Sequence, residues 1–381
     1  MKFYFIYSAG GGAGDWNGVK RVWAESMPHH LKSRILLKFG DVFLEHASGN
    51  RIIRPQRWQN ITNLREWLFK NVSDDFIFSD ECNILLDSGT AKAVNLIAHH
   101  NPTTDCEKLI ETFNQVFEEN NIFEKYVDIV CDSDIDSAVT FDIPNPFKIR
   151  SQNGNARLNI IEKEHNDRLI ELSAIYSNIL YDGIKSRRGS RFANSSMMTI
   201  INGTWNQEEI DLFLNKLGYD PDKIAIGALS STSINQNNIY EYLDELAPFH
   251  FENASQLHFL GCGGFKKAEA IKNYGFDGEN ISVDCSTFIN RSIDGNTSGT
   301  SQSGYFDYYT KKLIRIRPDT IDDILNLHAR VDKPLYSCGE LKEILDMIIY
   351  HQSGNSSKET YNARAKLMFH NADVYRHNAE E

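Results

Sequence analysis

The sequence predicts an α/β protein, a (β/α)₈ TIM barrel with insertions and a C-terminal helical subdomain. Short apolar runs typical of buried strands occur eight times and alternate with stretches of helical periodicity. Several runs end in a polar residue or a glycine, as barrel strands often do at the upper mouth. The rival architecture, an open doubly wound sheet, would not need eight comparable strands. The expected strands are Lys2–Tyr7, Arg34–Phe39, Asn83–Asp87, Ala138–Asp142, Met198–Asn202, Lys223–Gly227, Leu257–Gly261 and Ile281–Asp284.

Helices are expected between the strands, and the chain divides into two parts. Residues 1–335 form the catalytic barrel, with an insertion at about 40–80, and residues 336–381 form the helical subdomain. A Ser/Gly/Thr-rich loop over residues 292–310 ends in an aromatic cluster, Tyr305 to Tyr309. The expected helices are Glu107–Tyr126, Leu158–Leu180, Glu208–Leu217, Ile239–Leu246, Ala268–Asn273, Gly339–Tyr350 and Ser357–Tyr375.

Composition restricts the class of protein. The chain has 381 residues, of which 41% are hydrophobic and 24% charged, as in a soluble globular protein. A net charge of −12 argues against a nucleic-acid packaging protein but allows an enzyme that grips a short segment through a local basic patch. No apolar run is long enough to span a membrane, so no membrane partner is expected. Six scattered cysteines without a CxxC pair indicate reduced thiols, hence the cytoplasm, or the host cytoplasm for a viral protein.

Three aspartates lie at expected strand ends, namely Asp87, Asp142 and Asp284. Taken singly, each is more often a turn or capping residue than a catalytic one. All three would nevertheless converge on one mouth, because the carboxyl ends of barrel strands meet there. Converging carboxylates suit cleavage of a glycosidic bond, with one as nucleophile on C1′ and another transferring the proton.

Two basic clusters interrupt an otherwise acidic chain. The first spans Lys185–Arg191 and the second Lys311–Arg317. Such runs are usually solvated surface, yet they are also the best candidates for contacts with a phosphate backbone. The nucleic-acid-binding candidates among them are Arg187, Arg188, Arg191, Lys311 and Lys312.

Seven short motifs, in the same order, resemble those of the tRNA-guanine transglycosylases and their DNA-modifying relatives. VDCSTFINRSIDG resembles that family's FDCVxPTRNARNG, LLDSGT its TDSGGFQ, and VTFDIP its VFDECTP. IINGTW is similar to IVQGG, IAIGALS to AIGGLSVGE, and LGCGG to MGVGxPE. KLMFHNADVY is similar to LLTIHNLHFY. The matches span about residues 83–376, and the ordered set is more specific than any one motif. The chain is most like the DNA-modifying branch.

The resemblance implies a base exchange, in which guanine is excised from a nucleic acid and a 7-deazaguanine of the preQ0 or preQ1 kind is inserted. It places Asp284 as the nucleophile, Asp87 as the proton-transfer residue and Asp142 as the reader of the guanine edge. No cofactor is required for this chemistry. Further substrate-binding positions carried over from the motifs are Ser88, Asn202, Gly227, Ala228 and Gly261.

Several departures from the family distinguish this chain. The base-stacking aromatic of DSGGFQ is Ala91 here. The arginine-rich segment after the nucleophile keeps only Arg291, which is a further nucleic-acid-binding candidate. The implied zinc ligands are reduced to Cys338, with His370 downstream and Glu340 and Glu343 in place of two cysteines. Two glutamates are uncommon in a structural zinc site, so we expect the metal to be lost or weakly held.

The polymer expected from these departures is DNA, with tRNA as the alternative. For DNA, the aromatic side chains of Tyr305, Phe306, Tyr308 and Tyr309 could supply the wedge or the stacking surface beside a flipped guanine. A non-catalytic nucleic-acid-binding barrel is a second class of hypothesis, against which the three aspartates count. An ordinary sugar hydrolase is a third, but it would predict a glutamate acid at a strand end, and no expected strand ends in Glu. The need for accessory proteins is left open by the sequence.

Overall fold

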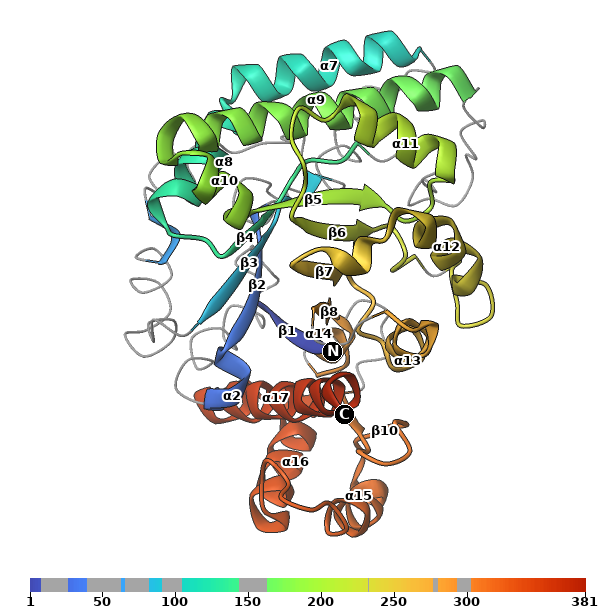
Figure 1. The fold of residues 1–381 in the computed structure, drawn as a ribbon. Coiled ribbons are helices and arrows are strands. Elements are labelled where there is room, and N and C mark those ends of the chain that lie inside the picture. The colour runs from blue at the N-terminus through green and yellow to red at the C-terminus, as the bar shows by residue number, and fades with distance from the viewer. Residues whose placement is uncertain are drawn as a thin grey trace.

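Eight parallel strands close into a barrel in the computed structural model of this chain (Figure 1). Residues 1–7, 27–39, 63–65, 82–90, 105–143, 163–231, 233–276, 280–292 and 303–381 are described. The barrel closes where β8 pairs with β1, through Phe3 with Val283 and Tyr4 with Asp284. The predicted (β/α)₈ barrel is confirmed. Its strands are β1 Lys2–Tyr7, β2 Arg34–Lys38, β3 Asn83–Asp87, β4 Ser137–Val139, β5 Met197–Asn202, β6 Lys223–Gly227, β7 Gln256–Phe259 and β8 Ile281–Asp284.

Strand β4 is shorter than predicted, because side-chain hydroxyls take the place of backbone partners after the bond from Thr140 N–H to the carbonyl of Met198 at 2.9 Å. The backbone N–H of Ile200 on β5 donates to Thr140 Oγ1 at 3.0 Å. The N–H of Ile143 donates to Ser173 Oγ on a neighbouring helix at 2.9 Å. Asp142 therefore lies in the loop that follows β4 rather than at the strand's last position, but at the same end of the barrel.

The helices surround the strands (Figure 1). The single helix predicted over Glu107–Tyr126 is wrong: two helices meet at Asn121, whose φ of 49° is left-handed and ends the first helical run. Helices and 3₁₀ turns are α2 His29–Lys32, α7 Cys106–Glu119, α8 Ile122–Asp132, α9 Lys163–Arg188, α10 Ser190–Ser196, α11 Gln207–Lys216, α12 Ile239–Leu246, η2 Ala247–Phe249, η3 Phe251–Asn253, α13 Phe265–Tyr274, α14 Thr287–Ser292, η4 Pro318–Thr320, α15 Ile321–His328, α16 Cys338–Gln352 and α17 Lys358–Glu380. None of the helices in these ranges is both long enough and apolar enough to cross a membrane.

The C-terminal region combines a two-stranded hairpin with helices. Strand β9, Gly304–Phe306, pairs antiparallel with β10, Leu313–Arg315, and both lead into α15 and α16. The last helix, α17, returns to the barrel, where Phe369 lies 6.1 Å from Phe5 of β1 between ring centroids. It thereby covers the seam between β8 and β1.

A second, smaller hydrophobic cluster lies beyond the barrel. It joins the hairpin, α15, α16 and one face of α17, with Tyr305, Ile316, Ile324, Leu345 and Leu367 among its members. Elements on both sides of residue 335 contribute to it, and the domain boundary placed there from the sequence stays a prediction. The predicted insertion at 40–80 lies outside the described residues except for 63–65, where Leu64 N–H donates to Ser133 Oγ at 2.7 Å.

Candidate active site

The carboxyl ends of the barrel strands form a mouth at which most of the predicted site residues meet. Asp87 ends β3, Asn202 ends β5, Gly227 ends β6 and Asp284 ends β8. Because all eight strands are parallel, these positions lie at one end of the barrel. Asp142 joins them: a Cβ added to Gly227 would lie 3.9 Å from Asp142 Oδ2.

Asp284 is a buried carboxylate held by one of its two oxygens. Its side chain is only 4% exposed. Oδ1 accepts a hydrogen bond from the backbone N–H of Gly261 at 2.7 Å and contacts His258 Nε2 at 3.0 Å. Within the described residues, no hydrogen bond to Oδ2 is found. One oxygen is thus fixed, and the other takes no hydrogen bond from the described residues and could meet a substrate.

The glycine cluster after β7 is required for this arrangement. Gly261 has a φ of +70°, and a Cβ there would come within 2.6 Å of Ser230 Cβ. Gly263 N–H donates to the backbone carbonyl of Asp284 at 2.7 Å, and a Cβ on Gly263 would lie 2.9 Å from that oxygen. A side chain at Gly261 would collide with the loop after β6, and one at Gly263 would collide with the end of β8. The glycines therefore allow the loop to donate a backbone N–H to the carboxylate.

Asp142 and Asp87 interact electrostatically. Burial, followed by the negative charge of Asp87, raises the pKa of Asp142 to about 7. Asp87 is half-buried, and its Oδ1 accepts from the N–H of Gly89 at 3.1 Å in a local turn. Two carboxyls whose environments differ in this way suit different roles, one in recognition and one in proton transfer.

The remaining predicted substrate-binding positions line the loops around this pair. Ser88 is buried, and its Oγ accepts from Thr90 Oγ1 at 2.9 Å. Asn202 Oδ1 accepts from the backbone N–H of Thr204 at 3.0 Å, which leaves its amide N–H groups as the donors it can offer. Ala228 has a left-handed φ of 66°, which turns the chain immediately after β6. These residues could present backbone and amide groups to a planar base.

His258 was not among the residues predicted from the sequence, yet it contacts the nucleophile candidate directly. The available signal was the alternation of polar side chains on β7, with Gln256 and His258 two positions apart in an otherwise apolar strand. A second missed residue is Lys267 of α13, whose Nζ donates to the carbonyls of Leu229 and Ser231 at 2.6 and 2.9 Å. It ties the loop after β6 to the helix that follows β7.

The basic cluster at Lys185–Arg191 is not brought to the mouth. It lies at the end of α9 and the start of α10, next to the amino end of β5 and so at the opposite end of the barrel. Arg187 pairs with Asp128 at 2.5 Å, and Arg188 pairs with Asp134 at 2.9 Å. The third predicted residue there, Arg191, is exposed. This placement does not support contacts to a nucleotide bound at the mouth.

The second cluster lies on the mouth side. Lys311 Nζ is 6.0 Å from the ring centroid of Phe265, the first residue of α13, which begins after the carboxyl end of β7. Burial lowers the pKa of Lys311, while Lys312 is exposed. Arg291 belongs to α14, but its side chain lies outside the described residues, as does all of Ala91.

The aromatic cluster expected to stack on or wedge between bases is mostly structural. Tyr305, Phe306 and Tyr308 are buried at 0%, 6% and 5% exposure, whereas Tyr309 is 61% exposed. Their burial has a clear cause, since Tyr305 stacks on His370 at 4.4 Å and Phe306 packs edge-on against Tyr375. Of the four, only Tyr309 could meet a ligand without unfolding the hairpin.

The four implied metal ligands do not converge. Glu340 accepts from the N–H and Oγ of Ser337 in a capping box at the start of α16, beside an exposed Cys338 and an exposed Glu343. His370 is fully buried on α17, and its Nε2 contacts the carbonyl of Phe306 at 3.0 Å. In the described part of the chain, no group of three or more His, Cys, Asp or Glu residues could hold a metal ion. The residues present do not fit a tetrahedral zinc site.

We predict that the purified protein contains no stoichiometric structural zinc. Burial lowers the pKa of His370 to about 4, and stacking on Tyr305 together with the small hydrophobic cluster stabilises the region without a metal. Chelator treatment should leave the thermal unfolding midpoint unchanged. Elemental analysis finding one tightly held zinc per chain would overturn this prediction.

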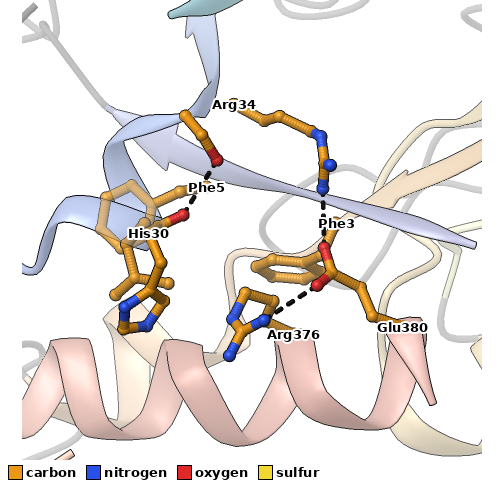
Figure 2. A pocket seen from close by; sticks show the side chains of 8 residues that line it. Phe3, Phe5, His30, Arg34, Arg376 and Glu380 are labelled. Atoms are coloured by element: carbon orange, nitrogen blue, oxygen red, sulfur yellow. Dashed lines mark hydrogen bonds and ion pairs between the residues drawn. The ribbon is translucent and has the colours of Figure 1, made fainter.

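A pocket of about 170 Å³ lies away from the mouth, on the outside of the barrel between β1, α2 and α17 (Figure 2). Phe3 and Phe5 line it, and its charged groups are paired with one another. Glu380 bonds Arg34 at 2.7 Å and Arg376 at 2.8 Å. These ion pairs join α17 to the barrel, so we assign the pocket a structural role.

A scan of the chain against known protein-family models finds no match, and a search of curated proteins finds none either. The fold and the site define the chain by class: it is a (β/α)₈ barrel with Asp87, Asp142 and Asp284 at the carboxyl ends of its strands.

Proposed function

We propose that this barrel is a base-exchange transglycosylase that replaces guanine in DNA with a 7-deazaguanine. The observation that carries the proposal is the buried carboxylate of Asp284, fixed through Oδ1 by Gly261 and His258 with Oδ2 uncommitted among the described residues. A carboxylate held in this way can act as a nucleophile on an anomeric carbon. Its place at a barrel mouth, with two more carboxyls at the same end of the barrel, on β3 and just after β4, supports the assignment.

The reaction would proceed by two displacements at C1′ of a flipped-out nucleotide. In the first, Asp284 Oδ2 forms a bond to C1′ while the bond from C1′ to guanine N9 breaks, and Asp87 gives a proton to the departing base. In the second, N9 of the 7-deazaguanine attacks the same carbon, Asp87 takes the proton from it, and Asp284 is released. One glycosidic bond replaces another with retention of configuration, so no nucleotide triphosphate is consumed.

Base recognition would fall to Asp142. Guanine presents two adjacent donors, N1–H and the 2-amino group, and an ionised carboxylate can accept from both, whereas adenine lacks this pair. The closeness of Asp142 to the backbone of Gly227 supports this role, because the base can lie against a position without a side chain. A pKa of about 7 leaves the carboxyl able to ionise when the base binds.

We predict that DNA, rather than tRNA, is the polymer. The family's arginines after the nucleophile are largely replaced here, and Ser292 at one of those positions is buried and donates through Oγ to the carbonyl of Phe288 at 2.7 Å. Backbone contacts would instead come from Lys311 and Lys312 on the mouth side. The test supplies a labelled 7-deazaguanine together with equal amounts of duplex DNA and unmodified tRNA, and we expect the label in DNA.

A pair of matched variants refines this test. Lys311→Gln combined with Lys312→Gln should lower incorporation into DNA roughly 10-fold and reduce its salt dependence, as expected when phosphate contacts are lost. Arg187→Gln, at the opposite end of the barrel, serves as the control and should leave incorporation unchanged. Label entering tRNA but not DNA, with any required accessory proteins present, would refute the choice of DNA. Label entering neither polymer would refute base exchange itself.

A further inference from the structure

The barrel interior beneath Asp284 is polar, although barrel cores are normally filled by branched apolar side chains. Residues two apart on a strand share a face, so the inward positions of β7 and β8 can be read from the pairing of His258 with Ser282. His258, Ser282 and Ser137 are completely buried, and Tyr4 is 2% exposed. The interior polar residues that contact one another are Asp284, His258, Ser282, Gln256, Tyr4, Asn83, Ser137 and Lys223.

These side chains form one continuous series of contacts from the amino end of the barrel to its mouth. Lys223 Nζ donates to Ser137 Oγ at 3.0 Å, and Ser137 Oγ donates to Gln256 Oε1 at 3.0 Å. Gln256 Nε2 donates to Ser282 Oγ at 3.4 Å. His258 then connects the two ends, with Nδ1 2.8 Å from Ser282 Oγ and Nε2 3.0 Å from Asp284 Oδ1.

The direction of donation in this series follows from which groups can only donate. An ammonium group has no acceptor, so Ser137 Oγ accepts from Lys223 and gives its own hydrogen to Gln256 Oε1. The Gln256 amide is then oriented with its nitrogen toward Ser282, whose hydroxyl hydrogen is free to point at His258 Nδ1. An imidazole that accepts at Nδ1 carries its hydrogen on Nε2, facing Asp284. Each donor therefore points toward the carboxylate.

Gln256 has a second branch that fixes its orientation. Its Nε2 also donates to the hydroxyl of Tyr4 at 3.1 Å, and Tyr4 donates in turn to Asn83 Oδ1 at 2.5 Å. If the amide were reversed, its oxygen would face Tyr4 and Ser282 while its nitrogen faced a serine that already accepts from Lys223. The branch thus favours the orientation in which the amide hydrogens lead toward His258.

We propose that His258 is the positioning residue for Asp284, held as a neutral imidazole with its hydrogen on Nε2 by a one-directional series of hydrogen bonds that begins at Lys223. Its role is to keep the buried carboxylate ionised and to occupy Oδ1, so that Oδ2 faces the substrate. The catalytic consequence rests on the proposed function, whereas the direction of donation stands independently of it.

The other groups described near this pair do not supply the same effect. The ring of Tyr4 meets His258 edge-on at 5.4 Å between centroids, so it packs against the imidazole without bonding to it. Burial raises the pKa of Cys262 to about 12 and that of Cys285 to about 11, so both thiols are neutral beside Asp284 at pH 7. Of the described groups, His258 and the N–H of Gly261 are then the donors that offset the cost of burying the charge.

The first test reads the protonation of His258 in the unaltered protein. Long-range ¹H–¹⁵N correlation spectra of the full-length protein labelled with ¹⁵N-histidine distinguish the two neutral tautomers and the imidazolium. The His258→Phe variant assigns the His258 signals by their loss. We expect a neutral ring with its hydrogen on Nε2 at pH 7.5. A hydrogen on Nδ1, or on both nitrogens, would overturn the proposed direction.

The second test compares three variants by the pKa of the Asp284 carboxyl, followed by ¹³C signals assigned with Asp284→Asn. His258→Phe fills the space but removes the donor, so the pKa should rise by at least about one unit. His258→Gln restores an N–H near the Nε2 position, so the pKa of the Asp284 carboxyl should return most of the way to its value in the unaltered protein. His328→Phe replaces another completely buried histidine, in the C-terminal cluster. It is the matched control and should leave the pKa of the Asp284 carboxyl unchanged. An unchanged pKa in folded His258→Phe would overturn the proposal.

Kinetics separate this proposal from the function on which it rests. If base exchange occurs, His258→Phe should lower kcat about 10- to 100-fold, leave KM for DNA unchanged, and shift the acidic limb of the pH profile upward. Unchanged kcat and pH profile would overturn the role of His258. If the unaltered protein exchanges no base while both spectroscopic results hold, the proposed function fails and the hydrogen-bond series stands.

Discussion

Asp284→Asn is expected to abolish base exchange, with a loss of about 10⁴-fold or more, as is usual when a covalent nucleophile is removed. The amide has nearly the shape of the carboxylate, and its oxygen can still accept from Gly261 and His258. It cannot form the bond to C1′. The fold and the affinity for DNA should therefore be retained, which thermal unfolding and a gel-shift titration can check alongside incorporation of a labelled 7-deazaguanine.

Asp244→Asn is a suitable control for this experiment. Asp244 lies on α12, outside the barrel, where its Oδ1 accepts from the hydroxyl of Tyr274 at 2.8 Å. The same isosteric change there should leave exchange at the level of the unaltered protein. Full exchange by Asp284→Asn would remove Asp284 from the mechanism, however well the protein folded.

Asp142→Ala is expected to lower incorporation by roughly two orders of magnitude or more, because a two-point contact to the guanine edge is lost and the base donors are left unpaired. Steady-state incorporation with guanine and with the 7-deazaguanine measures the effect. Unchanged incorporation would reassign Asp142 to a structural role. For the unaltered protein, base binding should weaken as the pH falls below about 7, since the protonated carboxyl no longer accepts twice.

The raised pKa of Asp142 also predicts a pH-dependent stability of the fold. Burial and Asp87 raise its pKa from 3.8 to about 7, so above pH 7 the folded state bears the cost of a buried charge that the unfolded chain does not. That cost, about 4 kcal/mol for a shift from 3.8 to about 7 at 1.36 kcal/mol per pKa unit, falls as the pH drops from 7 and vanishes below about 4. Asp142→Asn should therefore stabilise the protein at pH 8 but not at pH 4, as denaturant unfolding at the two pH values would show. An equal change in the free energy of unfolding at pH 8 and at pH 4 would contradict the raised pKa.

The barrel was predictable because its signal is local. Each strand is a short apolar run, and four of the eight, including Asn83–Asp87 and Ile281–Asp284, have the bounds expected from the sequence. Where tertiary hydrogen bonds determine the end of a strand, the observed end differs from the predicted one. The hydroxyls of Thr140 and Ser173 take backbone hydrogen bonds near the end of β4, which therefore ends before Asp142. A single left-handed residue, Asn121, divides a helix whose hydrophobic period continues across the break.

The candidate site was predictable in its carboxylates and less so in its surroundings. Strand ends identify Asp87 and Asp284, because topology alone brings them to one mouth. The sequence does not say at which end of the barrel a basic run will lie. Lys185–Arg191 lies at the end opposite the mouth. The sequence also does not reveal that Tyr305 would pack on a buried histidine, or that His258 would contact the nucleophile candidate. These depend on contacts between distant segments.

The most direct test of the central claim is to trap the covalent intermediate. Duplex DNA carrying a 2′-fluoro guanosine, whose electron-withdrawing substituent slows cleavage of a glycosyl ester, is incubated with the protein and the mixture is denatured. We predict a stable protein–DNA adduct whose peptide map places the sugar on Asp284, and no adduct with Asp284→Asn. Incorporation of 7-deazaguanine into DNA without any adduct at Asp284, or an adduct on another residue, would contradict the account.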